Sequence, residues 1–284
     1  MVIEVVSTEP VIPREQRPVI ASYLAERLAG PVAIEIWTQR ESALVRTDRD
    51  PCTFCEPLAS AARQLAAMHP LITLTPYDLD EHTERALEAG IERPPVTVLR
   101  GRNGREVRFV GLWSGLLFSP LMDTMLFLGA GFAPIKEETR EGLKAIEKDL
   151  EIELLVAPYD PYSAHTLRVA TAFAVESARL HVEAIEVSEF PRLADSRMIS
   201  EIPVMTVNGR RYVGAWNEEE LLQQLHRIAN EDSDPVIREH VMTSPFMTVE
   251  QAQELAAREA QGLPAQGAPG QSPTTPGGLI IPGR

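Results

Sequence analysis

Cys52 and Cys55 are the residues of this chain best suited to do chemistry, and Thr53 and Phe54 lie between them. A C-x-x-C pair that follows a strand and opens a helix has its first sulfur beside backbone N–H groups without intrahelical partners. These groups and the helix dipole stabilise a thiolate, which lowers the pKa of Cys52 and makes it the nucleophile. Cys55, one turn further, can attack a mixed disulfide and release the product. The sequence predicts a dithiol–disulfide couple, with Thr53 and Phe54 in contact with the substrate.

Charged residues near Cys52 also act on its pKa, and their balance is left open by the sequence. Asp50 and Glu56 would oppose formation of the thiolate. A stretch of about a dozen residues, Gln39–Asp50, separates the preceding strand from the cysteines and carries three arginines that would favour it. They are Arg40, Arg46 and Arg49.

Two other interpretations of the cysteines stay open. Two motifs from different chains could share one zinc ion, because a structural zinc site normally takes four protein ligands. The six histidines show no paired metal spacing, so no metal site within one chain is predicted. The cysteines could also be inert buried thiols.

A second candidate for the site is the Pro94-Pro95 pair, because Pro95 opens the strand-like run Pro95–Val98. A proline at the first residue of a strand is a good place for a cis bond, and the match to Pro203 described below favours the bond before Pro95. The free backbone edge beside it could then pair with a bound polypeptide. A rigid turn without a substrate role is the alternative.

The layout around the cysteines occurs twice. Asp160 and Pro203 lie 108 residues after Cys52 and Pro95. The repeat also includes two apolar runs that end in tryptophan, Phe109–Trp113 and Tyr212–Trp216. A repeated order of landmarks indicates a duplicated fold. The second copy reads Asp160-Pro161-Tyr162-Ser163, so it lacks cysteines, and Asp160 is expected to cap its helix instead.

The apolar patterns predict the elements that position these residues. In the first copy we expect helices at 15–28, 52–68, 81–89 and 116–128, and strands at 31–37, 71–75, 96–99 and 107–110. In the second copy we expect helices at 137–150, 161–179, 190–198 and 218–228, strands at 152–157 and 182–187, and a hairpin turning at Asn208-Gly209.

These elements define the expected domains of an α/β protein. We expect residues 13–133 to form a first unit with the C-x-x-C motif and residues 134–231 to form a second unit without cysteines. Residues 232–260 are a linker with a short helix at 248–259, and residues 261–284 are expected to be disordered because Gly, Pro, Gln, Ser and Thr dominate them.

The composition excludes several classes of function. A net charge of −14 over 284 residues argues against nucleic acid as a partner. The N-terminus has no basic region or long apolar core, so no secretory signal is expected, and the cytoplasm is the default compartment. The best membrane candidate, Gly115–Ile135, is interrupted by Ser119, Pro120 and Asp123, which favours a buried helix. No cofactor is implied.

The motif, the proline and the repeat together resemble the thioredoxin superfamily. The tandem layout over about Pro13–Ala229 resembles the two-unit, glutaredoxin-like protein disulfide oxidoreductases, with central mixed sheets flanked by helices. In that family the second unit usually reads C-P-Y-C, and this chain has Asp160 and Ser163 there. Flavin-linked alkyl hydroperoxide reductases also have a tandem unit with one active copy, but their second copy keeps the cysteines. A relay through both units is therefore not expected here.

The C-terminal segment Leu279–Arg284 resembles a docking peptide. Its Leu-x-Ile spacing and basic end are similar to the targeting peptides of cargo inside encapsulin shells, although Pro282 replaces the usual glycine. Leu279, Ile280 and Ile281 would dock the protein in such a nanocompartment. A terminus without a role is the alternative.

The leading hypothesis is a cytoplasmic thiol–disulfide oxidoreductase. Its substrates would be protein disulfides, for example in a partner peroxidase, and an electron donor not identified by the sequence would reduce it. The second copy would enlarge the binding surface or mediate a homodimer. The alternative is a non-catalytic adaptor that docks through its tail. A hydrolase built on Ser163 and His165 is not favoured, because no glycine elbow or acid partner accompanies them.

Overall fold

The computed structural model describes residues 11–40, 51–232 and 234–261. The chain divides into two compact units between Phe246 and Met247. The described part of the second unit contains α9 (Val249–Ala260), which matches the expected helix at 248–259.

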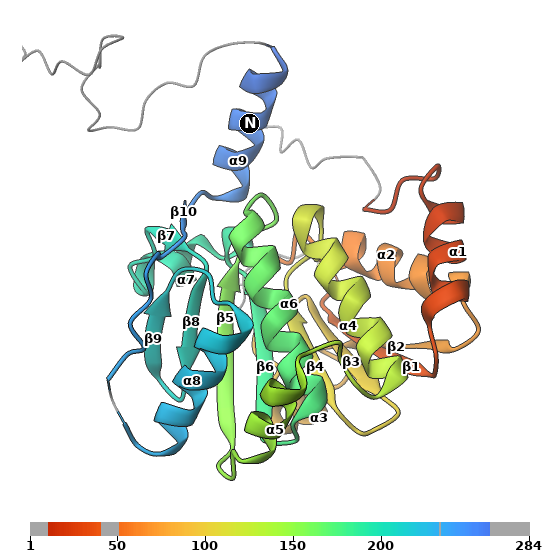
Figure 1. Cartoon of the computed structure of the whole chain (residues 1–284). Helices are drawn as coiled ribbons and strands as arrows, with labels where there is room; N and C mark the ends of the chain where they lie inside the picture. Colours follow the sequence, from red (N-terminus) through yellow and green to blue (C-terminus); the bar gives the residue numbers. More distant parts are fainter. Residues whose placement is uncertain (1–10, 41–50, 233, 262–284) are drawn as a thin grey trace, which may run out of the picture. The chain divides into compact units, whose positions relative to one another are not determined.

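The first unit is built on one mixed sheet. Its described strands form the order β2-β1-β3-β4-β6-β5-β8-β9 (Figure 1). Their bounds are β1 Val32–Thr38, β2 Ile72–Asp78, β3 Val96–Gly101, β4 Glu106–Val110, β5 Leu150–Val156, β6 Leu180–Glu186, β8 Val204–Val207 and β9 Arg210–Val213. A two-residue strand, β7 (Glu201–Ile202), pairs with β10 (Ser244–Pro245) in a separate ladder.

The strand pairing repeats between the two halves of the sheet. β1 is parallel to β2 and antiparallel to β3, and β5 is parallel to β6 and antiparallel to β8. Each half ends in an antiparallel hairpin, β3–β4 or β8–β9. A parallel pairing of β4 with β6 joins the halves into one sheet. The duplicated fold predicted from the repeat is therefore visible in the strand order.

Helices cover the two faces of this sheet unequally. The helices are α1 (Arg17–Arg27), α2 (Cys55–Met68), α3 (Thr83–Glu88), α4 (Phe118–Ala130), α5 (Glu137–Lys144), α6 (Pro161–Glu176), α7 (Pro191–Ser196) and α8 (Glu218–Ala229), with 3-10 turns η1 (Gly115–Leu117) and η2 (Val187–Glu189). Buried side chains of α1, α2, α4, α5, α6 and α8 share one apolar core with one face of the sheet. The short helices α3 and α7 pack on the other face. Figure 1 shows α4, α6 and α8 in front of the sheet.

Local chemistry sets the ends of several elements. Asp160 caps α6 by accepting hydrogen bonds from the backbone N–H groups of Tyr162 and Ser163, and Pro161 opens the helix. Gly131 ends α4 in the left-handed region, with φ 84°. Asn208 and Gly209 turn the β8–β9 hairpin with φ 45° and 80°, which confirms the Asn-Gly prediction.

The predicted fold class is confirmed, and one expected helix is wrong at its end. α5 stops at Lys144, and Leu150 opens β5 instead of closing the helix predicted for 137–150. Leu143, Ile146 and Leu150 have helical spacing, but Leu150 is buried as a strand residue. The tail predicted for 261–284 lies outside the described residues from 262 onwards.

The domain boundaries of the two predicted thioredoxin-like units stay a prediction. The boundary at residues 133 and 134 falls in the connection between α4 and α5, and both halves share the sheet. The membrane candidate forms η1 and α4, which packs against α6. Among the described residues, no helix has the length and apolarity needed to cross a bilayer.

Candidate functional site

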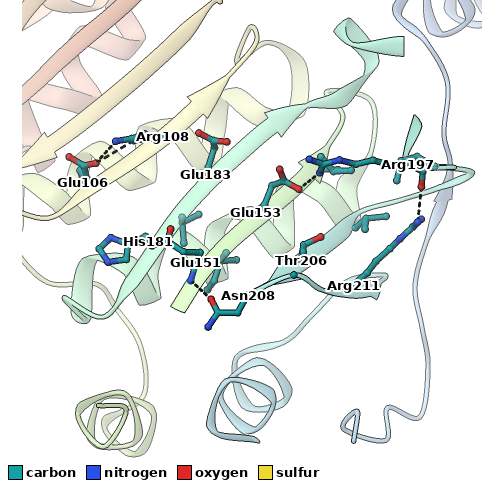
Figure 2. A pocket seen from close by; sticks show the side chains of 16 residues that line it. Glu106, Arg108, Glu151, Glu153, His181, Glu183, Arg197, Thr206, Asn208 and Arg211 are labelled. Carbon is teal, nitrogen blue, oxygen red and sulfur yellow. Dashed lines mark hydrogen bonds and ion pairs between the residues drawn. The ribbon is translucent and has the colours of Figure 1, made fainter. Parts of the chain in front are cut away.

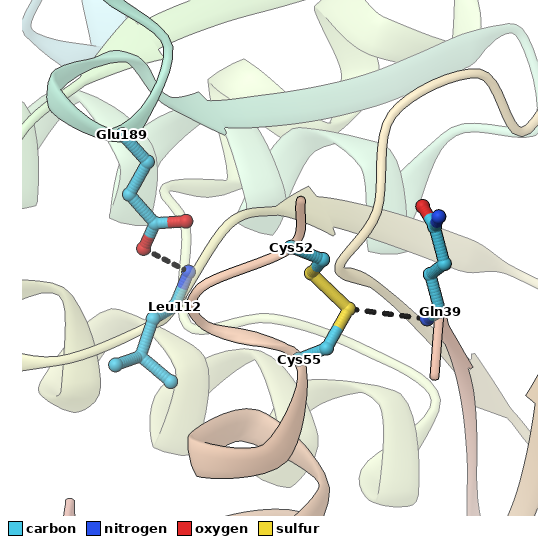
Figure 3. The surroundings of a disulfide bond; sticks show 5 residues. All are labelled: Gln39, Cys52, Cys55, Leu112 and Glu189. Carbon is cyan, nitrogen blue, oxygen red and sulfur yellow. Dashed lines mark hydrogen bonds between the residues drawn. A yellow bond between two sulfur atoms is a disulfide. The ribbon is translucent and has the colours of Figure 1, made fainter. Parts of the chain in front are cut away.

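The two cysteines form a disulfide at the start of α2 (Figure 3). Cys52 is partly exposed, whereas Cys55 is buried, with 4% of its surface accessible. The Cys55 sulfur accepts a hydrogen bond from the backbone N–H of Gln39, the residue after β1, at 3.2 Å. The end of β1 therefore holds the inner sulfur, and the outer sulfur is the one that a substrate could reach.

The helix begins later than the sequence predicts. α2 starts at Cys55, with Phe54 as its N-cap residue, so Cys52 lies in the turn before the first helical residue. The backbone N–H of Cys55 donates to the Cys52 carbonyl at 3.4 Å. Thr53 is exposed and Phe54 is half-buried against the main core, and contact of either with a substrate stays a prediction.

Two of the charged neighbours have partners of their own. Arg40 forms ion pairs with Asp78 at 3.5 Å and with Glu81 at 2.8 Å. Glu56 pairs with Arg63 at 2.6 Å on the helix surface. Because each is paired, Arg40 and Glu56 change the electrostatic potential at the sulfurs less than the sequence suggests. Arg46, Arg49 and Asp50 lie outside the described residues.

The proline pair lies at the same end of the sheet as the disulfide. The bond between Pro94 and Pro95 is cis, as is the bond between Ile202 and Pro203. β1 and β3 pair Trp37 with Val96, and continuing this register places Pro95 and Pro94 beside the residues that follow Trp37. Those residues include the Gln39 that binds the Cys55 sulfur. The substrate-binding role of Pro94 and Pro95 stays a prediction.

The loop after β4 completes this end of the first half. The Gly111 N–H donates to the Pro95 carbonyl at 2.8 Å. The Trp113 indole is buried and donates to the Thr97 hydroxyl at 3.0 Å. These bonds fix the loop Gly111–Trp113 against the start of β3.

A buried carboxyl pair from the second half, Glu186 and Glu189, supports the same loop. Glu189 accepts a hydrogen bond from the Leu112 N–H at 2.7 Å. Figure 3 shows Glu189 and Leu112 in the surroundings of the disulfide. Glu186 accepts hydrogen bonds from the N–H groups of Ser188 and Glu189, both at 3.1 Å. Burial raises the pKa of Glu186 to about 7. Burial and, next, the charge of Glu186 raise the pKa of Glu189 well above its ordinary value.

Sequence reasoning missed this pair. Glutamates are usually exposed, and the signal in the sequence was weak, because Glu186 stands between the apolar residues Ile185 and Val187. Glu189 shows that the half without cysteines contributes a residue to the surroundings of the disulfide (Figure 3).

The matching position of the second half keeps the geometry without the sulfurs. The Ser163 hydroxyl accepts a hydrogen bond from the Ala157 N–H at 3.2 Å, as the Cys55 sulfur accepts from Gln39. Asp160 and Ser163 are completely buried. His165 is exposed on α6, so the structure does not join it to Ser163 as a nucleophile and base.

A cavity lies away from the disulfide. It has a volume of about 700 Å³ and is lined by residues of β4, β5 and β6 and by residues between Arg197 and Arg211 (Figure 2). Charged side chains of both signs line it, with ion pairs of Arg197 with Glu153 and of Arg108 with Glu106. The cysteines follow β1, and none of the residues that line this cavity belongs to β1 or β3.

Several solved structures have the same fold as this chain. The alkylhydroperoxide reductase AhpF from Enterococcus faecalis has a TM-score of 0.65 and 21% identity, over 75% of this chain and 98% of that chain. A protein disulfide oxidoreductase from Aeropyrum pernix has a TM-score of 0.67 and 23% identity, over 78% of this chain and 94% of that chain. Sso1120 from Sulfolobus solfataricus has a TM-score of 0.50 and 13% identity, over 69% of this chain and 96% of that chain. These similarities confirm the tandem thioredoxin fold.

No protein-family model matches this sequence, and no curated protein sequence matches it. The expected docking residues Leu279, Ile280 and Ile281 lie outside the described residues.

Proposed function

We propose that this chain is a thiol–disulfide oxidoreductase that acts on protein disulfides through Cys52 and Cys55. One observation carries the proposal. The two sulfurs are bonded to each other at the start of a helix, and the first is partly exposed while the second is buried. This arrangement suits a couple in which one cysteine meets the client and the other resolves.

In the proposed cycle, the Cys52 thiolate attacks one sulfur of a client disulfide. The client S–S bond breaks, one client thiolate leaves, and a mixed disulfide with Cys52 forms. The Cys55 thiolate then attacks the Cys52 sulfur, which releases the second client thiolate and forms the disulfide of this structure. Two electrons pass from the dithiol to the client, and a thiol donor must return them before the next cycle.

The surrounding residues suit a polypeptide client. Thr53 and Phe54 flank the reactive sulfur, and Pro94 and Pro95 lie at the same end of the sheet. We assign these four residues to client binding. The two halves, 13–133 and 134–231, would act as one catalytic and one supporting domain, and a homodimer through the supporting domain is the corresponding assembly.

A peroxidase is the client that we favour. This choice rests on the similarity in fold to the alkylhydroperoxide reductase AhpF. A peroxidase that has reduced its peroxide holds an oxidised cysteine, and a dithiol of this kind can reduce it.

Reduction of insulin disulfides by dithiothreitol tests the chemistry. Cys52→Ser should remove the catalysed rate. Reduced Cys55→Ser, mixed with insulin after dithiothreitol has been removed, should form a mixed disulfide with one insulin chain that is visible on a non-reducing gel. His165→Gln, an exposed change on α6, is the matched control and should keep the wild-type rate. A wild-type rate in Cys52→Ser would refute the proposal.

The predicted docking role of the tail is tested separately. Deleting residues 261–284 should leave insulin reduction unchanged and abolish co-purification with an encapsulin shell expressed in the same cell. A free-standing oxidoreductase keeps its reductase rate after this deletion, whereas a non-catalytic adaptor has no such rate and loses its association with the partner.

A further inference from the structure

The chain after α8 returns along the edge strand β9. Figure 1 shows this return path, which ends in β10. Arg238 anchors it, because its guanidinium donates to the carbonyls of Val213 and Ala215 at 2.6 and 2.9 Å. The same guanidinium stacks over Trp216, 4.0 Å from the ring centroid. The returning chain is therefore held against the end of β9 before it reaches β10.

The next residues, Val241–Phe246, lie across the second half as an extended segment. On one side, the Ala215 N–H donates to the Met242 carbonyl at 2.9 Å. On the other side, Ser244 pairs antiparallel with Ile202, and the Phe246 N–H donates to the Ser200 carbonyl at 3.0 Å. Backbone hydrogen bonds on both sides hold the segment in a groove.

The floor of this groove is shaped for close approach. Gly214 has φ 92°, and a Cβ there would lie 2.5 Å from the Val241 side chain and 3.2 Å from the Met242 carbonyl. Glycine therefore allows the segment to cross directly over the loop after β9. At the other end, Phe246 packs against the second apolar core of the sheet.

Ser244 places the segment at the position that matches Cys52. Its hydroxyl donates to the Asp160 carboxylate at 2.6 Å. Asp160 occupies the place of Cys52 in the repeat, and Ile202-Pro203 occupies the place of Pro94-Pro95. The segment thus presents Ser244 where a client of the first half would present its cysteine.

Burial agrees with this comparison. Asp160 is completely buried, whereas Cys52 is partly exposed. Leu112 of the first half matches Ala215 of the second. The Leu112 N–H donates to the Glu189 side chain, whereas the Ala215 N–H donates to a backbone carbonyl of the segment. Among the described residues, no strand pairs with the residues before Pro95 as β10 pairs with β7.

We propose that the second half is a peptide-binding site that the chain fills in cis with its own segment Val241–Phe246. The segment takes the place of a client strand, so this half is closed to other extended peptides. The occupancy uses no cysteine of this chain, but the comparison of the segment with a client strand rests on the proposed function.

Hydrogen exchange of the unmodified protein is the first test. The amides of Ala215, Ser244 and Phe246 should exchange slowly in the native state, together with their neighbours in the segment. Exchange of 241–246 at the rate of an unstructured peptide would overturn the proposal.

Site-directed cross-linking is the second test. In a Cys52→Ser, Cys55→Ser background, Asp160→Cys is combined with Ser244→Cys, and diamide takes up the two electrons and two protons as the disulfide forms. The matched control combines Asp160→Cys with Pro245→Cys, because Pro245 is the exposed neighbour of Ser244. At micromolar protein, the linked pair should react on the order of a thousandfold faster within a chain than between chains.

The expected result is a monomeric cross-link for the Ser244 pair and much slower cross-linking for the Pro245 pair. Equal rates for the two pairs, or no cross-link at Ser244 in protein with a native circular dichroism spectrum, would refute the proposal. Covalent dimers would show that the segment of a second copy fills the groove, which also contradicts filling in cis. Because this background lacks Cys52 and Cys55, neither result bears on the redox proposal.

Discussion

Replacing Glu189 by Gln should stabilise the protein, and the gain should grow with pH. Glu189 is buried beside Glu186, and one of its oxygens accepts the Leu112 N–H. The other oxygen, Oε2, is buried without a hydrogen-bond partner among the described residues. A glutamine keeps the acceptor for Leu112 and has no charge to bury. The substitution therefore removes the cost of ionisation while the loop contact is kept.

The size of the effect follows from the raised pKa values. A carboxyl whose folded-state pKa is raised stays protonated in the fold at pH values at which the unfolded chain has already lost the proton. Stability then falls by about 1.4 kcal/mol for each pH unit between the two pKa values. Burial raises the pKa of Glu186 from 4.5 to about 7. Burial raises the pKa of Glu189 in the same direction, well above its ordinary value, so the cost of ionising Glu189 grows as the pH rises above 4.5.

Urea unfolding between pH 4.5 and 8 measures this dependence. Wild-type protein should lose stability as the pH rises from 4.5 to 7. Glu189→Gln should match the wild-type free energy of unfolding near pH 4.5 and exceed it increasingly at higher pH, by at most about 1.4 kcal/mol for each pH unit. Glu88→Gln, at an exposed position at the end of α3, is the control. It should change the free energy of unfolding by no more than about 0.5 kcal/mol at either pH. A gain for Glu189→Gln that does not vary with pH would refute the reasoning.

Three further changes test other contacts. Asp160→Ala removes the cap of α6 and should lower the free energy of unfolding in urea by about 1–2 kcal/mol. Asp160→Asn should keep most of that stability, and equal losses in the two variants would contradict the capping role. Arg238→Gln removes the anchor of the returning chain, so the amides of 241–246 should exchange faster than in wild type, and unchanged exchange would show that the anchor is dispensable. Thr97→Val leaves the buried Trp113 N–H without its acceptor and should lower the free energy of unfolding by about 1–3 kcal/mol, measured by thermal unfolding. Thr97→Ser keeps a hydroxyl acceptor and should lose less.

Local signals with a physical mechanism predicted much of the fold. Asn208-Gly209 gave the hairpin because both residues tolerate positive φ, and both have it. Asp160 was expected as an N-cap and is one. The repeat of Cys52 and Pro95 at Asp160 and Pro203 indicated the duplicated strand order.

The elements that sequence reasoning missed depend on distant partners. β10 has two residues, one of them a proline, so it has no periodic pattern, and it forms because β7 offers a backbone edge. The helix predicted for 137–150 was too long, because burial of Leu150 in a strand produces the same spacing as a helix face. The role of Glu189 depends on a hydrogen bond to Leu112, 77 residues away, which no local pattern reveals.

The most direct test of the account is the pH dependence of alkylation at Cys52. In Cys55→Ser, Cys52 is the single remaining cysteine, and its rate of reaction with iodoacetamide follows the fraction of thiolate. We predict a midpoint clearly below about 8.5, the pKa of a free cysteine, because the helix start stabilises the anion. A midpoint at or above that value would contradict the claim that this sulfur is the attacking group.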